Sequence, residues 1–242
     1  MFERSTKVAA VAALVFGIAA SPLRGQAALI GPGAAFISGG VSQLSTGDLD
    51  DRLAAQGYPT FGRKASTLGV GAYRIFSNRI LLGFEGHGFI VGDEEHQGRN
   101  VGLSGGYATL GLGYVFTASP RVRLYPRIGI GAAGIALEME SDADAVEFDD
   151  ALTGGAAAPV DRDPVLSRDG IAFDIGAGIE LLRSSRGSGP FIGLRVGYLA
   201  APFNSSWDYY ERASYVREAT GGPDATPSGP YLRVVIGGAW RR

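Results

Sequence analysis

Residues 171–181 read IAFDIGAGIEL, and this alternation decides the fold. Successive side chains of an extended strand point to opposite faces, so the stretch has one apolar face and one face of glycines and carboxylates. A soluble β-sandwich or barrel turns its large apolar residues inward, whereas a membrane-spanning barrel turns them outward to lipid. Glycine and charge then share the interior. The two faces are Phe173, Ile175, Ala177, Ile179 and Leu181 against Asp174, Gly176, Gly178 and Glu180.

Eight such stretches occur along the chain. Six have an apolar face without charge, and those at 29–41 and 65–76 are ambiguous in their parity. Long polar connectors at 42–64, 93–102, 140–169 and 205–229 alternate with short ones at 77–78, 118–120 and 184–189. This alternation predicts an all-β fold, an eight-stranded antiparallel up-and-down transmembrane β-barrel with short periplasmic turns. A secreted, lipocalin-like barrel with the bulky face inward is the rival fold.

The first residues predict a cleaved secretory signal peptide at 1–27. Arg4 and Lys7 precede an apolar run at 8–20, and Gly25 and Ala27 are the small residues of a cleavage site. The run is too short to cross a bilayer comfortably, although a retained anchor is the alternative. Residues 28–242 then form one barrel domain.

Bulk composition narrows the possible partners and sites. The chain has 38 glycines, no cysteine and a formal charge of −2. Without cysteine there is neither a disulfide framework nor a thiolate metal site. The balance of charge argues against nucleic acid as a partner, because nucleic-acid binding favours a clustered basic patch.

Aromatic residues beside the short turns and the carboxyl terminus predict a girdle at one rim of the barrel: Phe76, Phe116, Phe191 and Trp240. With these features, residues 28–242 resemble the small eight-stranded outer-membrane proteins of Gram-negative bacteria. The resemblance implies a bacterial outer-membrane location, with outer-membrane lipids and lipopolysaccharide as partners. The last strand, 229–240, looks like the signal read by the outer-membrane assembly machinery, although Arg241 and Arg242 follow its terminal aromatic residue.

The first long connector contains a predicted short helix. Thr46 is the expected amino-terminal cap, Asp48, Asp50 and Asp51 suit the positive first turn, and Gly57 ends the helix. Leu49 and Leu53 fall on one face, and a helix this short needs that face to pack on something. It either rests on the barrel rim or acts as a lid.

Two acidic segments raise the question of a metal site. The third connector carries Asp142, Asp144, Glu147, Asp149 and Asp150, without the glycine and terminal glutamate of a calcium loop. The segment 93–96 ends in His96, but neighbouring residues diverge at a strand end. Solvated loops are the favoured interpretation, and we expect no metal and no cofactor.

The charged residues on the inward faces form the most suggestive group. Buried charges need partners, and an eight-stranded barrel is just wide enough for side chains to fill. The sequence therefore predicts an interior salt-bridge network, with a gated pore or ligand site as the alternative. Its members are Glu85, His87, Arg123, Arg127, Asp174, Glu180, Arg195 and Arg233.

Few residues suggest catalysis. His87 shares a face with Glu85, and Ser104 is a conceivable nucleophile for a lipid-modifying hydrolase. We expect no catalytic residue and a non-enzymatic protein that is structural or binds ligands through its long extracellular loops, the extracellular ligand being unknown. A carrier or pore for small hydrophobic molecules and a lipid hydrolase are the two alternatives.

Overall fold

The computed structural model describes residues 32–77, 79–96, 99–119, 121–141, 165–184, 187–211 and 215–240. Within these ranges the side chains of 92–96, 99–100, 117–118, 140–141, 210–211 and 215–217 are left out of the description. The predicted signal peptide at 1–27 lies outside the described residues, as do the acidic residues of the third connector.

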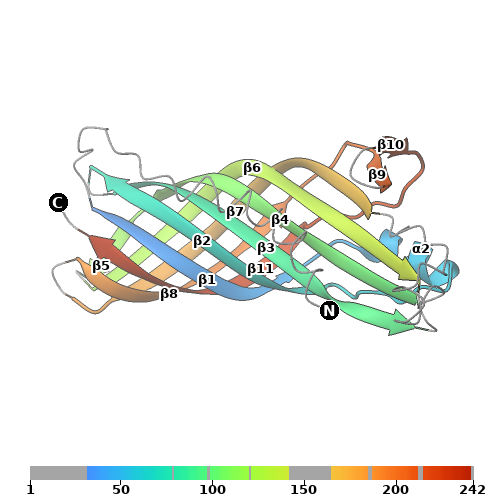
Figure 1. Ribbon diagram of the computed structural model, residues 1–242. Coiled ribbons are helices and arrows are strands. Elements are labelled where there is room, and N and C mark those ends of the chain that lie inside the picture. Colours follow the sequence, from blue (N-terminus) through green and yellow to red (C-terminus); the bar gives the residue numbers. More distant parts are fainter. Residues whose placement is uncertain are drawn as a thin grey trace, which may run out of the picture.

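Eight strands close into an antiparallel barrel in which each strand pairs with the next and the last pairs with the first. Figure 1 shows a long cylinder with obliquely running strands. The strands are β1 (Gly33–Gln43), β2 (Lys64–Phe76), β3 (Ile80–His96), β4 (Arg99–Tyr114), β6 (Val122–Ser141), β7 (Val165–Leu182), β8 (Gly189–Ala200) and β11 (Gly229–Trp240). The predicted fold class is therefore confirmed.

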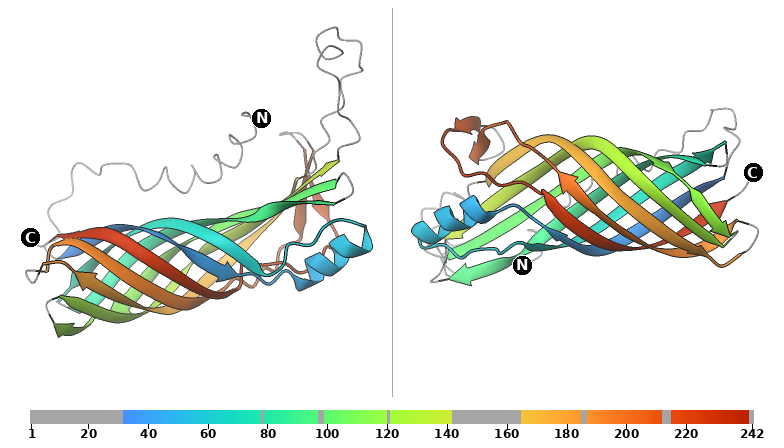
Figure 2. Two further views of the ribbon diagram at one scale, coloured as in Figure 1. Left: turned by 90° about the horizontal axis from the view of Figure 1, so that it is seen from below. Right: turned by 180° about the vertical axis from the view of Figure 1, so that it is seen from behind.

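Three short strands add to this barrel. β5 (Phe116–Ser119) follows β4 after Val115 and pairs with β6. β9 (Trp207–Glu211) and β10 (Tyr215–Ala219) form a hairpin that extends the outer part of β7. With helix α2 (Gly47–Ala55), this hairpin lies at the end of the barrel opposite the carboxyl terminus (Figures 1 and 2). We call this the long-loop end and the other the short-turn end.

The second long connector was placed wrongly. β3 continues to His96 and β4 begins at Arg99, so most of 93–102 is strand. These strands remain paired beyond an irregularity in register between Val91 and Glu94. Backbone pairing satisfies the amide groups of polar residues as well as those of apolar ones, so composition alone did not reveal this extension.

The bulky faces of the strands point outward. Leu68, Leu110 and Ile175 are more than 60% exposed, and the other large apolar residues of the predicted outer faces are exposed with them. The two strands whose parity was ambiguous, β1 and β2, also turn bulky aliphatic residues outward: Ile37 and Leu68 are exposed, whereas Phe36 and Tyr73 are buried. A lipocalin-like barrel requires the opposite arrangement, so that rival is wrong.

The interior is occupied by three layers of buried side chains. An apolar cluster, which we call the outer apolar cluster, fills the long-loop end, where Phe89, Leu103, Ile135 and Leu199 meet. A second apolar cluster, with Phe36, Ile75 and Leu81, fills the short-turn end. Charged and tyrosine side chains lie between them.

Helix α2 covers the long-loop end. Leu49 and Leu53 are buried in the outer apolar cluster, as their spacing predicted. The expected side-chain cap is absent: the Thr46 hydroxyl lies near the Gly62 carbonyl and the Asp50 carboxylate instead. The helix ends before Gly57, whose φ of 76° permits the reversal. Among the described helical residues, none form a helix long and apolar enough to cross a membrane.

Replacing Ile175 by Lys tests whether this wall faces lipid. Ile175 follows Asp174 of the charged layer and is 63% exposed, so its depth is near the middle of the barrel. A Lys at the bilayer midplane costs about 2–4 kcal/mol of unfolding free energy. The same change at the exposed rim residue Phe116 is the control, because near an interface it costs only about 0–1 kcal/mol. Reversible unfolding from lipid bilayers gives both values, and equal costs would contradict a lipid-facing wall.

Candidate functional site

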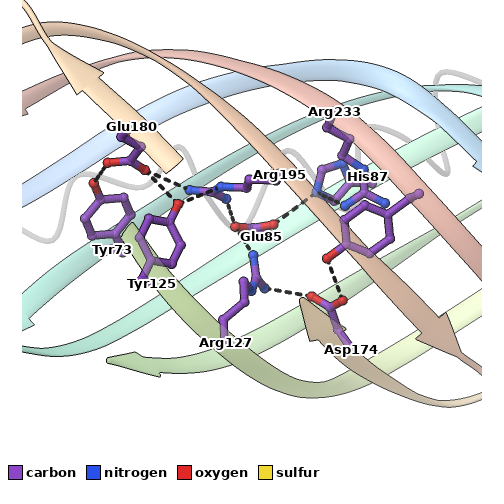
Figure 3. Close-up of polar contacts among 10 residues, drawn as sticks. Tyr73, Glu85, His87, Tyr125, Arg127, Asp174, Glu180, Arg195 and Arg233 are labelled. Atoms are coloured by element: carbon purple, nitrogen blue, oxygen red, sulfur yellow. Dashed lines mark hydrogen bonds and ion pairs between the residues drawn. The ribbon is translucent and has the colours of Figure 1, made fainter. Parts of the chain in front are cut away.

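The candidate site is the charged middle layer of the barrel (Figure 3). All eight residues predicted for the interior network are buried, with exposures from 0% for Glu180 to 8% for Arg123. They come from β3, β6, β7, β8 and β11, strands far apart in the sequence. Their alternation with outward apolar residues is what turns all of them toward one lumen.

Glu85 lies at the centre of the layer. Its Oε1 atom contacts the guanidinium groups of both Arg127 and Arg195. Arg127 continues to Asp174, with Nη2 at 3.0 Å from Oδ2, and Arg195 continues to Glu180, with Nη2 at 3.3 Å from Oε1. The five charges therefore form one chain of alternating sign across the lumen. Such pairing is what a charge needs to be tolerated in a low-dielectric interior.

Three tyrosines complete the network. Tyr73 and Tyr125 both donate to the carboxylate of Glu180, the second at 2.8 Å, and Tyr231 donates to Asp174 at 2.8 Å. Arg195 Nε in turn donates to the Tyr125 hydroxyl at 2.9 Å. The sequence prediction listed only charged residues. Tyr125 shares the parity of Arg123 and Arg127 on β6, and Tyr231 that of Arg233 on β11, and this signal could have included them. Tyr73 lies on β2, which carries no charge of the network, so parity gave no such signal there.

Arg123 anchors the network at the short-turn end. Its guanidinium donates to the Tyr73 hydroxyl at 3.1 Å and to the Gly187 carbonyl at 3.0 Å, and it lies 3.8 Å from Glu180. Arg123 thus ties a turn to the middle layer.

Interior glycines leave room for these large side chains. A Cβ on Gly178 would lie 2.5 Å from Cζ of Tyr125, and a Cβ on Gly69 would overlap Nδ1 of His87. These two glycines are therefore a packing requirement of the charged layer, since a larger residue would displace a network side chain.

The aromatic residues of the predicted girdle divide between the two faces. Phe116 and Trp240 are 52% and 38% exposed on the outer wall, and Phe76 is half-buried there. The prediction of Phe191 as a girdle residue is wrong, because its side chain is 4% exposed and packs in the second apolar cluster, at the short-turn end. Its parity with Arg195 already indicated the inward face. Tyr114, edge-on to Phe116 at 4.9 Å, is an outward aromatic that the prediction missed.

Metal ligands do not converge in the described part of the chain. No group of three or more histidines, aspartates or glutamates there is arranged to hold an ion. His96 and its acidic neighbours lie on β3, but their side chains are outside the description.

Ser104 does not face His87. Ser104 lies on β4 one residue from the buried Leu103 and so shares the outer parity of Leu110, whereas His87 is 2% exposed inside the barrel. The two side chains are on opposite sides of the wall. The geometry therefore gives this serine no base.

Comparison with known proteins supports the architecture. No protein-family model and no curated protein matches the sequence. A major outer membrane protein from Thermus thermophilus superimposes with a TM-score of 0.51 at 9% identity, covering 87% of this chain and 99% of that chain. The fold is that of an outer-membrane barrel. With its apolar outer wall, this fold assigns the protein to the bacterial outer membrane.

Two other similar structures have lower TM-scores. Ail, the attachment invasion locus protein of Yersinia pestis, has a TM-score of 0.48 at 14% identity and covers 88% of this chain and 100% of that chain. OprG of Pseudomonas aeruginosa has a TM-score of 0.43 at 11% identity, covering 88% and 97%. The closed antiparallel barrel of eight strands confirms the predicted resemblance to eight-stranded outer-membrane barrels as a likeness of fold.

Replacing Arg127 by Leu should destabilise this outer-membrane barrel. The change leaves Asp174 and Glu85 each without one cation, and breaking a buried pair in this way costs about 3–5 kcal/mol. We expect the folded band in an unboiled SDS gel to disappear at a lower temperature than in the wild type.

The control is Arg79→Leu, which removes a fully exposed guanidinium at a short turn and should leave the transition where it is. In the double variant Arg127→Leu/Asp174→Leu, part of the lost stability should return, because the stranded carboxylate is gone. An unchanged transition in Arg127→Leu would show that the network does not stabilise the barrel.

Proposed function

We propose that this protein is a non-enzymatic outer-membrane barrel with a closed lumen, which acts through the surface at its long-loop end. The observation that carries the proposal is the charge chain that crosses the lumen from Asp174 to Glu180. An apolar cluster lies on each side of it. Side chains tied to one another across the lumen leave the long-loop end as the accessible part of the molecule.

The elements of the long-loop end are joined into one platform. Ser45 and Thr226 exchange two backbone hydrogen bonds of 3.0 Å, which connect the first connector to the last. Arg52 of α2 donates to the Gly221 carbonyl at 3.3 Å, and the Trp207 indole donates to the Pro223 carbonyl at 2.9 Å. A platform held in this way presents a preorganised surface, which reduces the ordering cost of binding.

The remaining partners follow from position in the membrane. The exposed apolar wall is the proposed contact with outer-membrane lipid chains, and the long-loop end is the proposed contact with lipopolysaccharide. Strand β11, with its alternating buried and exposed residues, is the proposed signal for the assembly machinery.

Planar-bilayer recording tests the closed lumen. We expect the purified wild-type barrel to give no steady conductance, because the network and the two apolar clusters occupy the lumen. A porin added afterwards to the same bilayer is the positive control. Reproducible conductance steps from the wild-type protein alone would contradict the proposal.

A carrier for small hydrophobic molecules is the second candidate, and an interruption in the wall favours it. β7 pairs with β8 over residues 173–182 and with β9 over residues 165–167. Residues 168–172 therefore have no ladder partner on that side among the described strands. The segment 201–206 covers this seam. The Arg168 guanidinium, which the sequence prediction missed, donates to the carbonyls of Ser205 at 2.7 Å and Phe203 at 2.9 Å.

The seam lies beside a depression on the outer wall. This depression has a volume of about 420 Å³, and its lining is mostly apolar and includes Phe173, Ile175 and Tyr198. On the lumen side of the wall, Ala172 and Phe203 belong to the outer apolar cluster, at the long-loop end. A route from the long-loop end to lipid would therefore pass between apolar groups, provided that the segment 201–206 moved.

A reversible disulfide across the seam separates the two candidates. A Cβ on Gly170 would lie 3.5 Å from Cα of Phe203, and the chain has no other cysteine, so Gly170→Cys/Phe203→Cys suits a crosslink. Uptake of the dye N-phenylnaphthylamine is measured in oxidised and reduced samples of the same preparation. A closed barrel predicts equal rates, whereas faster uptake after reduction would support the carrier.

The hydrolase alternative loses its geometric basis. His87 Nδ1 and Ser38 Oγ both lack a hydrogen-bond partner among the described residues, so they are not bonded to each other. Both side chains are also deep in the lumen, at 2% and 3% exposure. A general base must reach its nucleophile and a substrate, and here neither contact is provided.

A further inference from the structure

Arg233 is the guanidinium of the middle layer that lacks a carboxylate. It is 1% exposed, and no carboxylate of the described residues lies within 4.0 Å of it, whereas Arg123 has one carboxylate partner and Arg127 and Arg195 have two each. Its Nη1 atom lies 3.4 Å from Nε2 of His87, and its Nε and Nη2 atoms have no hydrogen-bond partner in the part of the chain that the structure describes. A buried charge without a counter-charge is costly, most of all inside a membrane.

Aromatic rings compensate only part of this charge. The Arg233 guanidinium carbon lies 3.7 Å from the ring centre of Tyr231 and 5.3 Å from that of Tyr107. Ring faces attract the cation. They do not, however, satisfy the unpaired N–H groups of Nε and Nη2 in the guanidinium plane.

Several buried polar atoms of the middle layer also lack a hydrogen-bond partner among the described residues. Besides Arg233 Nε and Nη2, they include Ser38 Oγ, Thr67 Oγ1, His87 Nδ1 and Tyr107 OH. The guanidinium nitrogens can only donate, whereas the hydroxyls and the imidazole nitrogen can either donate or accept. Asp174 Oδ2, the one carboxylate oxygen among such atoms in the described residues, is already 3.0 Å from Arg127. The Arg233 guanidinium therefore needs an acceptor, and the other groups are able to donate to the same acceptor.

Strand register brings these donors together. Gly40 pairs with both Arg233 and Thr67, and Gly69 pairs with both Ser38 and His87. Because neither glycine has a side chain, the Arg233 side chain extends over β1 toward His87, and the imidazole lies over Gly69. The His87 ring in turn stacks on Tyr107 at 5.0 Å.

We propose that Arg233, His87, Tyr107, Thr67 and Ser38 form a binding site for a small monovalent anion such as chloride inside the barrel. The buried middle layer holds four guanidiniums and three carboxylates in the described residues, so one negative charge would balance it. A spherical anion accepts from several donors at once and brings no hydrogen that needs an acceptor. A water molecule brings two hydrogens and no charge, so it matches this environment less well.

The anion also selects a histidine tautomer. Nε2 of His87 lies 3.3 Å from Glu85 Oε2 and 3.4 Å from Arg233 Nη1. In a neutral imidazole this nitrogen can serve only one of them: it donates to Glu85 if it carries the proton, and it accepts from Arg233 if it does not. With the proton on Nδ1, the imidazole accepts from Arg233 and points a donor at the anion. Occupancy of the site therefore predicts the Nδ1–H tautomer.

Anion replacement at constant ionic strength tests the site on the full folded chain. Sodium chloride and sodium bromide should raise the midpoint temperature of the folded band relative to sodium gluconate, because gluconate is too large for the site. An equal midpoint in all three salts would overturn the proposal and indicate water in place of the anion.

Two variants with the same chemical change locate the effect. Thr67→Asp places a fixed carboxylate beside Gly40 and should abolish the halide response while raising the midpoint in gluconate. Thr109→Asp is the control, since Thr109 is an equally buried hydroxyl that pairs with Glu85 instead. It should lower the midpoint and keep the halide response. A response that persists in Thr67→Asp would mean that the anion binds elsewhere.

Nitrogen NMR gives a readout that does not depend on stability. The chain has two histidines, so ¹⁵N-histidine labelling gives few signals, and His96→Gln assigns them. We expect His87 Nδ1 to be protonated in chloride and to lose that proton to Nε2 in gluconate. An Nε2–H tautomer in both salts would contradict the site even if halides changed the thermal midpoint.

Discussion

The Glu85 carboxylate contacts two guanidinium groups, those of Arg127 on β6 and Arg195 on β8, and so links strands on different sides of the barrel. Once these charges are enclosed, the remaining interior must satisfy them, because an unpaired charge in a membrane-embedded lumen is costly. Tyrosine hydroxyls complete the two outlying carboxylates, and glycines provide the space that the long side chains need. The composition of the middle layer thus follows from one constraint, the pairing of buried charge.

The two ends of the barrel differ because only one of them carries long connectors. At the short-turn end, the apolar cluster is made by strand residues such as Phe36 and Leu81. At the long-loop end, strand residues are joined by connector residues, among them Leu49 and Leu53 of α2 and Phe203 beside the seam. The connectors therefore pack into the lumen as well as over it. This arrangement links any movement of the segment 201–206 to the packing of the outer cluster.

Much of the barrel was predictable from alternation alone. The period of two placed Glu85, Arg127, Asp174 and Arg195 on inward faces, and the order of long and short connectors implied eight antiparallel strands. The misplaced residues have identifiable causes. Phe191 was assigned by its nearness to a turn instead of by its parity, and residues 93–102 were read as a loop because they are polar. A Thr46 side-chain cap was expected from residue type, yet its hydroxyl lies near Gly62, a contact sixteen residues away.

The sequence by itself determined the number of barrel strands, the sidedness of six of the eight and the presence of an inward charged set, since these depend on local alternation. Only the tertiary structure decided which charges meet. The register of β1 with β2 and β11 sets Gly40 between Arg233 and Thr67, and that of β2 with β3 sets His87 over Gly69. Register couples residues far apart in the chain. Alternation excludes a shift by one residue, which would turn every side chain to the other face, but a shift by two residues keeps the same faces, so alternation alone does not say which residues pair. Three arginines of the middle layer consequently have carboxylate partners, and Arg233 lies instead against His87 and the rings of Tyr107 and Tyr231.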